Sequence, residues 1–441
     1  MTPNTDVAAQ PLARPWDVLA RWLPPRTPDC DYWWQLTGPH LATMMELAGY
    51  GAERQFEALL FHYHWVVPYL GPQPNPDGTV KWKSLLGAEG SPIEYSWKWN
   101  QPGGQPEVRH CFEAINEFTG TSLDPLNQLA NRELLHRLQE PVKSLNLEWC
   151  NHFVATLYDH DLSKYATDSS KGAHVTSTIF TAIEFLQNSY LFKTYFLPRK
   201  IGQFGPASMS VWKESLAGLE LENEARASLY DFLDNNEQGK LLSPFMIAVD
   251  DVEPAASRLK LYFQTPRTSF NSIREVMSLG GKIQVPEKSL RDLRDLIVSA
   301  AGLADDFPDD AELPLPEYNP AAADNFTELP ILLQGSLYYF DIALGAKTES
   351  LGIKYYASAR RYAGSDLSWA RGVMSWMRSK GRGEYCDKYL SLLESFSPHR
   401  SLGGDTGIQA YMSCMFKAGG ELDVTSYVSP EAFHPNRQNK K

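Results

Sequence analysis

Cysteine is scarce in this chain and shows no metal-binding pattern. Five cysteines occur among 441 residues, and none forms a CxxC pair or a Cys/His spacing typical of zinc ligands. Their odd number and wide separation argue against a structural zinc site and favour a reducing compartment. The five are Cys30, Cys111, Cys150, Cys386 and Cys414.

Long apolar runs are also missing. No segment approaches the roughly 18 consecutive apolar residues that a membrane-spanning helix needs. The best candidate, residues 58–70, contains His62, His64 and Pro68, and residues 1–31 lack the uninterrupted apolar stretch of a signal peptide. We therefore expect a soluble, cytoplasmic protein without a membrane partner.

Positive charge is outnumbered by negative charge. The chain has 41 Lys and Arg against 53 Asp and Glu, a formal net charge of −12. An acidic surface repels phosphate backbones, so we expect no nucleic-acid partner, and an anionic substrate must meet a local basic cluster. The GxSxG, Walker and GxGxxG motifs are absent from suitable contexts. Several common classes of hydrolase and nucleotide-binding enzyme are thereby disfavoured.

What the chain does contain is a repeated order of strand-like and helix-like segments. Apolar residues at helical spacing over 32–50 and 54–70 predict an N-terminal helical pair, closed by Gly71-Pro72. Pairs of strands then alternate with pairs of helices. Strands are expected near 92–99, 107–115, 175–183, 190–197, 244–250, 257–264, 332–343, 352–358, 408–417 and 422–429, and helices near 126–139, 146–160, 207–218, 222–235, 268–279, 288–301, 366–380 and 384–396.

Ten antiparallel strands would leave two exposed edges unless the sheet closes into a barrel, with the helices outside it. The proline-rich stretch 303–331 interrupts this order, and we interpret it as an irregular loop because strands and helices resume beyond it. We accordingly divide the chain into an N-terminal extension (1–30), one barrel domain (31–430) and a C-terminal tail (431–441).

The strands have chemically unequal faces. In 258–263, Arg258, Lys260 and Tyr262 share one face, and three apolar residues share the other. One such strand is usually a solvated face, but several with apolar backs indicate a cavity that holds an anion beside aromatic rings. The same parity joins Lys193 with Tyr195, Lys354 with Tyr356, and Tyr411 with Lys417, while Arg109 shares a face with Cys111 and Glu113.

An acidic group lies on a further strand, at Glu94. Parity places Glu94 with Ser96 and Lys98, opposite an Ile/Tyr/Trp face. A surface carboxylate paired with Lys98 is the simpler interpretation. If the aromatic face is the covered one, however, Glu94 points into the lumen and can accept a proton from an N–H or O–H group.

Asp305, Asp306 and Asp309 match the letters of the DDxxD motif that chelates magnesium in isoprenoid synthases. The motif needs its carboxylates on one helix face, and Pro308 inside it disfavours a regular helix. We also find no facing second metal motif. A solvated loop is therefore expected here, with no metal site.

The chain resembles fungal aromatic prenyltransferases of the dimethylallyltryptophan synthase family. The resemblance covers nearly the whole sequence and is carried by six segments in order. They are SPIEYSWKW (91–99), VRHCFE (108–113), KTYF (193–196), RLKLYF (258–263), IKYY (353–356) and YMS (411–413).

This resemblance implies an α+β fold, the αββα prenyltransferase barrel of ten antiparallel strands, and residue roles without a required cofactor. Glu94 and Lys193 are the expected catalytic residues, and Glu94 holds the acceptor N–H and helps to remove its proton. Lys354 and Lys417 stand where other members carry Gln or Arg. The implied diphosphate site is Arg109, Lys193, Arg258, Lys260, Lys354 and Lys417; the cation shield is Tyr195, Tyr262, Tyr356, Tyr411 and Tyr427; and the acceptor site is Leu85, Leu86 and Glu94.

The expected activity is transfer of a dimethylallyl group from dimethylallyl diphosphate to an aromatic carbon. The expected acceptor is a small molecule that contains an indole, such as an indole alkaloid, an indole diterpene or a cyclic dipeptide. A phenolic polycyclic polyketide is the alternative acceptor. A metal-dependent terpene synthase and a non-catalytic barrel that binds aromatic ligands are the alternatives from other classes. We expect a monomer or a homodimer.

Overall fold

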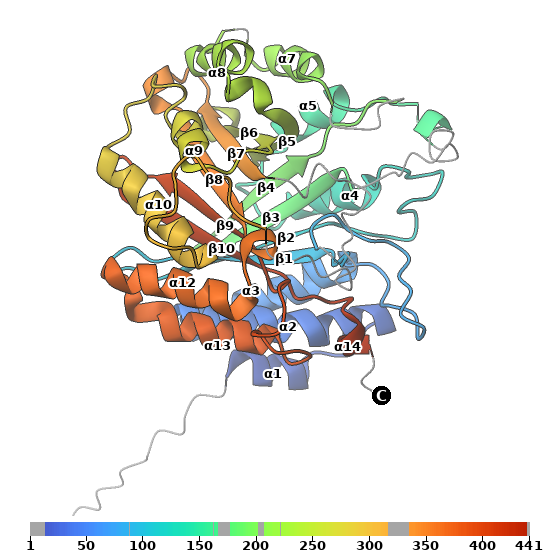
Figure 1. The fold of residues 1–441 in the computed structure, drawn as a ribbon. Coiled ribbons are helices and arrows are strands. Elements are labelled where there is room, and N and C mark those ends of the chain that lie inside the picture. The colour runs from blue at the N-terminus through green and yellow to red at the C-terminus, as the bar shows by residue number, and fades with distance from the viewer. Residues whose placement is uncertain are drawn as a thin grey trace, which may run out of the picture.

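A closed barrel of ten antiparallel strands forms the centre of the protein (Figure 1). The computed structural model describes residues 14–87, 89–161, 163–165, 177–201, 207–220, 222–315 and 335–438. Around the barrel each strand pairs with its neighbours in the chain, and β1 pairs with β10 to close it. The strands are β1 (Ile93–Lys98), β2 (Glu107–Phe112), β3 (Ile179–Phe185), β4 (Tyr190–Phe196), β5 (Ser243–Asp250), β6 (Arg258–Thr265), β7 (Ser336–Ala343), β8 (Gly352–Ser358), β9 (Gln409–Phe416) and β10 (Leu422–Val428).

Closure joins the two ends of the strand order, with Tyr95 opposite Val428 and Lys98 opposite Thr425. Because the barrel is closed, every strand has a hydrogen-bonded neighbour on both sides and no edge strand remains. The expected fold class and strand count are confirmed. The starts expected at 175 and 332 lie outside the described residues, where β3 begins at Ile179 and β7 at Ser336.

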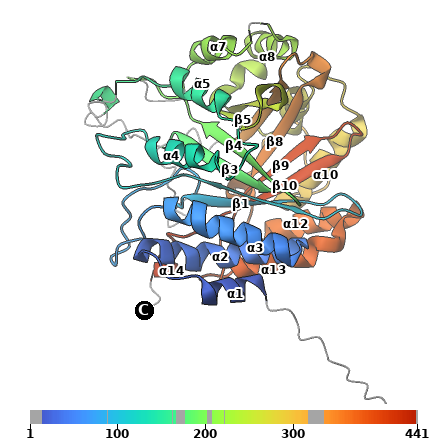
Figure 2. The same ribbon diagram turned by 180° about the vertical axis from the view of Figure 1, so that it is seen from behind.

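Helices cover the outside of the barrel (Figures 1 and 2). Helices α2 and α13, from opposite ends of the chain, pack side by side in the layer that also contains α1 and α3. Their order follows the expected alternation with the strand pairs. The main helices are α1 (Pro15–Trp22), α2 (Pro28–Ala48), α3 (Ala52–Phe61), α4 (Leu129–Leu138), α5 (Glu148–Thr156), α7 (Met209–Ala217), α8 (Glu224–Asn235), α9 (Phe270–Met277), α10 (Glu287–Ala301), α11 (Ala359–Tyr362), α12 (Asp366–Ser379), α13 (Cys386–Phe396) and α14 (Pro435–Gln438).

Local sequence signals explain where the long N-terminal helix begins and ends. The Thr27 side chain caps α2 by accepting a hydrogen bond from the Cys30 backbone N–H, and Pro28 occupies the first turn. Gly49 ends the helix with φ of 87°, a left-handed conformation that glycine adopts without a side-chain clash. Residues 15–22 of the expected N-terminal extension form α1, which packs against α3.

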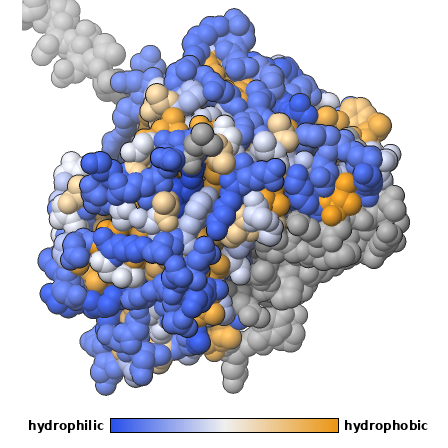
Figure 3. Space-filling model, turned by 90° about the horizontal axis from the view of Figure 1, so that it is seen from above, coloured by the Kyte–Doolittle hydropathy of each residue, from blue (hydrophilic) through white to orange (hydrophobic). Residues whose placement is uncertain are grey.

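The two faces of the strands enter different cores. Outward side chains join the large hydrophobic core under the helices; Tyr95, for example, donates a hydrogen bond from its hydroxyl to the Thr37 carbonyl of α2 at 3.3 Å. Inward side chains form a second, separate cluster inside the barrel. The upper surface is mainly hydrophilic, with scattered apolar patches (Figure 3). Among the described helices, none combines the length and apolar character needed to cross a bilayer.

Candidate active site in the barrel lumen

The lumen is charged at one end and aromatic along the rest of its length. The charged end is where β1 and β3 finish and where β2 and β6 begin, so it gathers Lys98, Glu107, Glu184 and Arg258. The opposite end contains Glu94 and the apolar side chains of the lumen cluster. This polarity follows from the antiparallel order, which brings alternate strand ends to the same rim.

The cations near β2 are paired with carboxylates. Arg109 Nε lies 2.9 Å from Glu184 Oε1, and the Lys193 ammonium contacts the same carboxylate. Arg109 also lies 3.4 Å from Glu107. Burial opposes ionisation of Glu184, but the charges of Arg109 and Lys193 hold its pKa below the ordinary value. Glu184 therefore holds two cations on one side of the lumen.

A second ion-pair cluster lies across β5, β6 and β7. Lys260 Nζ lies 2.6 Å from Asp250 Oδ1, and Arg258 Nε lies 2.9 Å from Asp250 Oδ2. Arg258 also reaches Asp341 at 2.9 Å. The two clusters place Arg109, Lys193, Arg258 and Lys260 around one end of the lumen, as strand parity predicted.

Two further lysines were expected in the diphosphate site. Lys354 is buried, with its Nζ 5.5 Å from the centroid of the Tyr339 ring. Lys417 is exposed and lies just beyond the end of β9, where its backbone N–H donates to the Glu421 carbonyl at 2.9 Å. Lys354 thus lies inside the barrel, whereas Lys417 lies in the β9–β10 hairpin at the rim.

Burial lowers the pKa of two lysines in the lumen. Desolvation lowers the pKa of Lys193 to about 7, although the Glu184 charge opposes the shift. It also lowers the pKa of Lys354 to about 8, helped by the positive charge of Arg109. An anion that enters the lumen would restore the charged form of both side chains.

A belt of tyrosines lies in the lumen. All five tyrosines expected to shield a cation belong to the lumen cluster, together with Leu85 and Leu86. The Tyr262 and Tyr356 ring centroids lie 6.1 Å apart, and the Tyr356 and Tyr427 centroids 5.7 Å apart. The structure thus brings together Tyr195, Tyr262, Tyr356, Tyr411 and Tyr427.

Several lumen residues escaped the sequence reasoning. Tyr339 lies 5.1 Å from Tyr262 and completes the belt, but its neighbour Tyr338 on the other face obscured the parity of that strand. Glu184, Asp250 and Asp341 were also missed, because basic and aromatic side chains defined the expected lumen face. Period-two parity within β3, β5 and β7 would have placed them on the lumen face.

Glu94 faces the lumen from β1. It lies opposite Cys111 of β2, a residue that packs against the lumen cluster, while the neighbouring Tyr95 is turned outward to α2. Burial raises the pKa of Glu94 to about 8, and the charge of Arg360 opposes this shift only in part. Lys98 pairs instead with Glu107 at 2.8 Å, so the expected alternative of a Glu94–Lys98 pair is wrong.

The Asp-rich motif lies outside the barrel in turns after α10. Arg294 of α10 contacts Asp309 at 2.7 Å and donates hydrogen bonds to the carbonyls of Asp305 and Phe307. Residues 305–309 are not helical, so their carboxylates do not share a helix face. The described part of the irregular stretch thus consists of turns; residues 316–331 lie outside the described residues.

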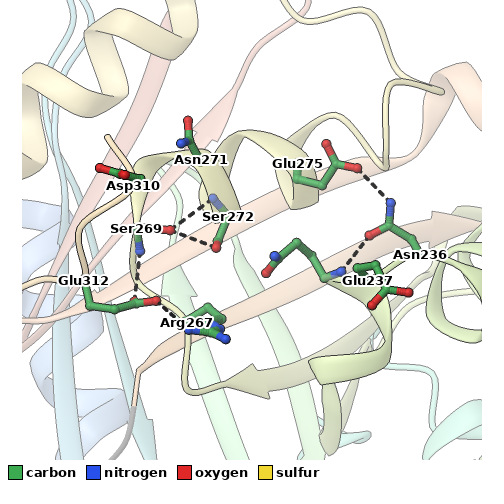
Figure 4. Close-up of a pocket in the computed structure, with 10 residues that line it drawn as sticks. Asn236, Glu237, Arg267, Ser269, Asn271, Ser272, Glu275, Asp310 and Glu312 are labelled. Carbon is green, nitrogen blue, oxygen red and sulfur yellow. Dashed lines mark hydrogen bonds and ion pairs between the residues drawn. The ribbon is translucent and has the colours of Figure 1, made fainter. Parts of the chain in front are cut away.

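An external polar cleft lies beside α9 (Figure 4). Several of its polar groups are paired: Glu312 accepts hydrogen bonds from the backbone of Thr268 and Ser269 and contacts Arg267, while Asn236 donates to Glu275. The cleft is separate from the lumen residues that the sequence singled out.

Comparison with known proteins places the chain in a family. The family model described as tryptophan dimethylallyltransferase matches residues 29–391. The chain belongs to this family. Prenyltransferase anuH of Penicillium roqueforti is 56% identical over 430 residues, covering 97% of this chain and 95% of the relative. The resemblance noted from the sequence is confirmed, and this tryptophan dimethylallyltransferase family member is a prenyltransferase.

A further relative and two solved structures are also similar to the chain. Xanthone prenyltransferase B of Emericella nidulans is 42% identical and covers 96% of this chain and 92% of the relative. The crystal structure of AnaPT from Neosartorya fischeri has a TM-score of 0.76 at 21% identity, covering 94% and 98% of the two chains. NotF, in complex with brevianamide F and DMSPP, has a TM-score of 0.75 at 21% identity, covering 95% and 99%. These structures share the prenyltransferase barrel.

Proposed function

We propose that this enzyme transfers a dimethylallyl group from dimethylallyl diphosphate to an aromatic carbon of a phenolic polycyclic acceptor. The observation that carries the proposal is the order of groups along one lumen: paired cations, a tyrosine belt, then a buried carboxylate. An anionic leaving group, a carbocation and a departing proton need these surroundings in this order. The proposal assigns one step of the reaction to each group.

In the first step the C1–O bond of the prenyl diphosphate breaks and diphosphate leaves with the electron pair. Arg109, Lys193, Arg258 and Lys260 would stabilise the departing charge through charge-assisted hydrogen bonds. Lys354 and Lys417 would add charge from the lumen wall and the rim. Because the diphosphate is neutralised by side chains, we propose that no metal is required.

The tyrosine belt would hold the dimethylallyl cation. Aromatic faces carry a negative quadrupole that attracts cations, and their bulk excludes the water that would quench the cation. Tyr195, Tyr262, Tyr356, Tyr411 and Tyr427 carry over this role, to which we add Tyr339 because its ring contacts the belt. The acceptor would meet the cation between this belt and Leu85 and Leu86.

In the last steps the aromatic carbon forms a bond to C1, and the arenium ion loses a proton towards Glu94. A carboxylate with a pKa of about 8 can take this proton, and before attack it can accept a hydrogen bond from a phenolic O–H, whose pKa is about 10. The ordinary carboxylate, near 4, would be a much weaker base. The burial of Glu94 therefore supports its role as the base and is compatible with a phenolic acceptor.

Two kinds of relative support different acceptors. Xanthone prenyltransferases A and B are 44% and 42% identical to this chain, which supports a phenolic polycyclic substrate. The family description names tryptophan, which supports the indole acceptor expected from the sequence and makes it our second candidate. The two xanthone relatives are individual proteins that are more than 40% identical to the chain, whereas the word tryptophan describes the family as a whole. We therefore place the phenolic class first.

The test is incubation of the purified enzyme with dimethylallyl diphosphate and matched panels of phenolic and indole acceptors, followed by mass spectrometry. We expect products that gain one or more prenyl groups in the phenolic panel, also in the presence of EDTA. Products confined to the indole panel would overturn the acceptor class. Acceptor binding with no consumption of the diphosphate would overturn the enzymatic function in favour of a binding barrel.

The cellular setting belongs to the same proposal. All five cysteines are free, which supports a reducing compartment such as the cytoplasm. We propose a monomer or a homodimer, and size-exclusion chromatography with light scattering would distinguish the two.

A further inference from the structure

A buried carboxylate that the reaction does not use lies beside the acceptor end of the lumen. Glu113 directly follows β2 and continues the inward series of Arg109 and Cys111. Its side chain is fully buried. Its backbone N–H donates a hydrogen bond at 2.8 Å to the carbonyl of Pro92, which lies two residues before Glu94 in the chain. Glu113 is therefore held next to the strand that carries the proposed base.

Hydrogen-bond donors surround this carboxylate. Asn127 Nδ2 donates to Glu113 Oε1 at 2.7 Å, and the Ser177 hydroxyl donates to Oε2 at 2.6 Å. The orientation of Asn127 is set from its other side, because its Oδ1 accepts from the Thr119 hydroxyl at 2.7 Å. The Ser84 hydroxyl also hydrogen-bonds Glu113. Together with the side chain of Trp82, four side chains thus converge on one acceptor.

The two serines connect Glu113 to the lumen leucines. The backbone N–H of Leu85 donates to Ser177 Oγ at 3.1 Å, and that of Leu86 donates to Ser84 Oγ at 3.2 Å. Each serine therefore accepts from a leucine and donates to Glu113. Both leucine side chains pack against the aromatic lumen cluster.

The leucines depend on this network because no regular secondary structure holds them. Residues 81–87 form neither helix nor strand. The remaining backbone support is local: Ser84 N–H donates to the Gly90 carbonyl at 2.9 Å, and Gly87 N–H to the Ser91 carbonyl at 3.1 Å. A loop held by few backbone hydrogen bonds takes its position from the side chains to which it is bonded.

We propose that Glu113 is a positioning residue that holds Leu85 and Leu86 against the acceptor, and so sets how deeply and in which orientation the acceptor lies. The inference deepens the proposed function, on which the role of the two leucines rests. Glu113 itself touches neither substrate in this scheme. Its effect reaches the acceptor through Ser177 and Ser84.

The chemistry of the carboxylate makes the role testable. Burial raises the pKa of Glu113, and the hydrogen bonds from its neighbours oppose this shift. In its ionised form Glu113 offers only acceptors, which matches the donors around it, whereas glutamine offers one acceptor and one NH₂ donor. In Glu113→Gln the NH₂ group would face a serine whose hydroxyl has already accepted a leucine N–H. The second lone pair of that serine can accept the NH₂ group, but its hydroxyl loses the bond that it donated to Glu113, so the serine and the leucine bonded to it are held less firmly. A misplacement of about 1 Å at a reacting centre can lower a rate on the order of 10²-fold.

The experiment measures steady-state kinetics of Glu113→Gln with whichever panel acceptor the wild-type enzyme converts. We expect kcat/KM for the acceptor to fall roughly 10- to 100-fold and the ratio of ring positions in the product to change. The KM for dimethylallyl diphosphate should stay within about twofold, since the cation clusters are at the other end of the lumen. Asp251→Asn is the matched control, because Asp251 is a buried carboxylate hydrogen-bonded to Thr194 on the outer face.

Unchanged acceptor kinetics and product ratio in Glu113→Gln would overturn the proposal. Equal losses for both substrates, or the same losses in Asp251→Asn, would also overturn it, because they indicate general damage. If Glu113→Gln does not fold, Ser177→Ala breaks the link to Leu85 and is expected to change the acceptor kinetics alone.

A measurement without substrates separates this inference from the proposed function. Hydrogen exchange of the unliganded protein should be faster in a peptide spanning 82–91 in Glu113→Gln, and unchanged in Asp251→Asn. Unchanged exchange in that peptide would overturn the positioning role even if no acceptor were converted. A wild-type enzyme that uses only indoles would overturn the acceptor class and leave this test intact.

Discussion

The raised pKa of Glu94 predicts an unusual pH dependence for the acceptor step. Burial places this pKa at about 8, so only about 1% of the side chain is ionised at pH 6 and about half at pH 8. A general base acts in its ionised form. We therefore expect kcat/KM for the acceptor to rise roughly 50-fold between pH 6 and pH 8.

The variant Glu94→Gln keeps the size of the side chain and removes the titrating group. Turnover should fall by roughly 10²–10⁴-fold, the usual loss of a positioned base, and the rise with pH should disappear. Affinity for dimethylallyl diphosphate should change little, because the cation clusters lie at the opposite end of the lumen.

Steady-state rates in overlapping buffers from pH 6 to pH 9 provide the assay, with Lys260→Ala as the control. The control should bind the diphosphate weakly yet keep the rising acceptor profile. A Glu94→Gln enzyme that retains the rise, or that turns over at the wild-type rate, would refute the assignment. Equal loss of turnover and of diphosphate binding would indicate structural damage.

Three further outcomes are expected. Lys193→Ala should raise the KM for dimethylallyl diphosphate about 30-fold, since a buried charge-assisted partner contributes about 2 kcal/mol; an unchanged KM would place this side chain outside the diphosphate site. Asp305→Asn combined with Asp309→Asn should be nearly silent in activity assays, with and without EDTA, because the Arg294–Asp309 pair is partly exposed and lies outside the barrel; a large loss restored by magnesium would contradict this. Burial lowers the pKa of His62 to about 3, below the 6.5 expected on unfolding, so the unfolded state binds the extra proton as pH falls below 6.5. Because of this residue, the free energy of unfolding should then drop by about 1.4 kcal/mol for each unit that the pH falls. Urea titrations at several pH values should show that the unfolding free energy of His62→Gln depends less steeply on pH.

Strand parity explains how much of the site could be predicted. In β6 the alternation of Arg258, Lys260 and Tyr262 with apolar residues predicted the lumen face, and the structure places Lys260 and Tyr262 inside the barrel and Arg258 at its charged rim. In β1 parity left two orientations open, and the outward packing of Tyr95 against α2 decides that Glu94 points inward. Period two is a property of any strand, so this information is local and can be obtained from the sequence.

The partners of these residues are not local. Arg109 meets Glu184 because β2 and β3 pair in one register, and Lys193 lies opposite Asp250 in another. Shifting either register by one residue would turn the partner to the outer face. Sequence reasoning therefore found the cations but missed the carboxylates that hold them.

By itself, the sequence determined the alternation of strand pairs and helix pairs, the inward face of most strands and the absence of a helix at the Asp-rich motif, because these depend on residues close in the chain. Only the tertiary structure decided what lies across the lumen. It left Lys417 at the rim, added Tyr339 to the belt, and linked Leu85 and Leu86 to Glu113 through serines almost a hundred residues apart. Barrel closure and strand register bring such residues together, and no short segment contains that information.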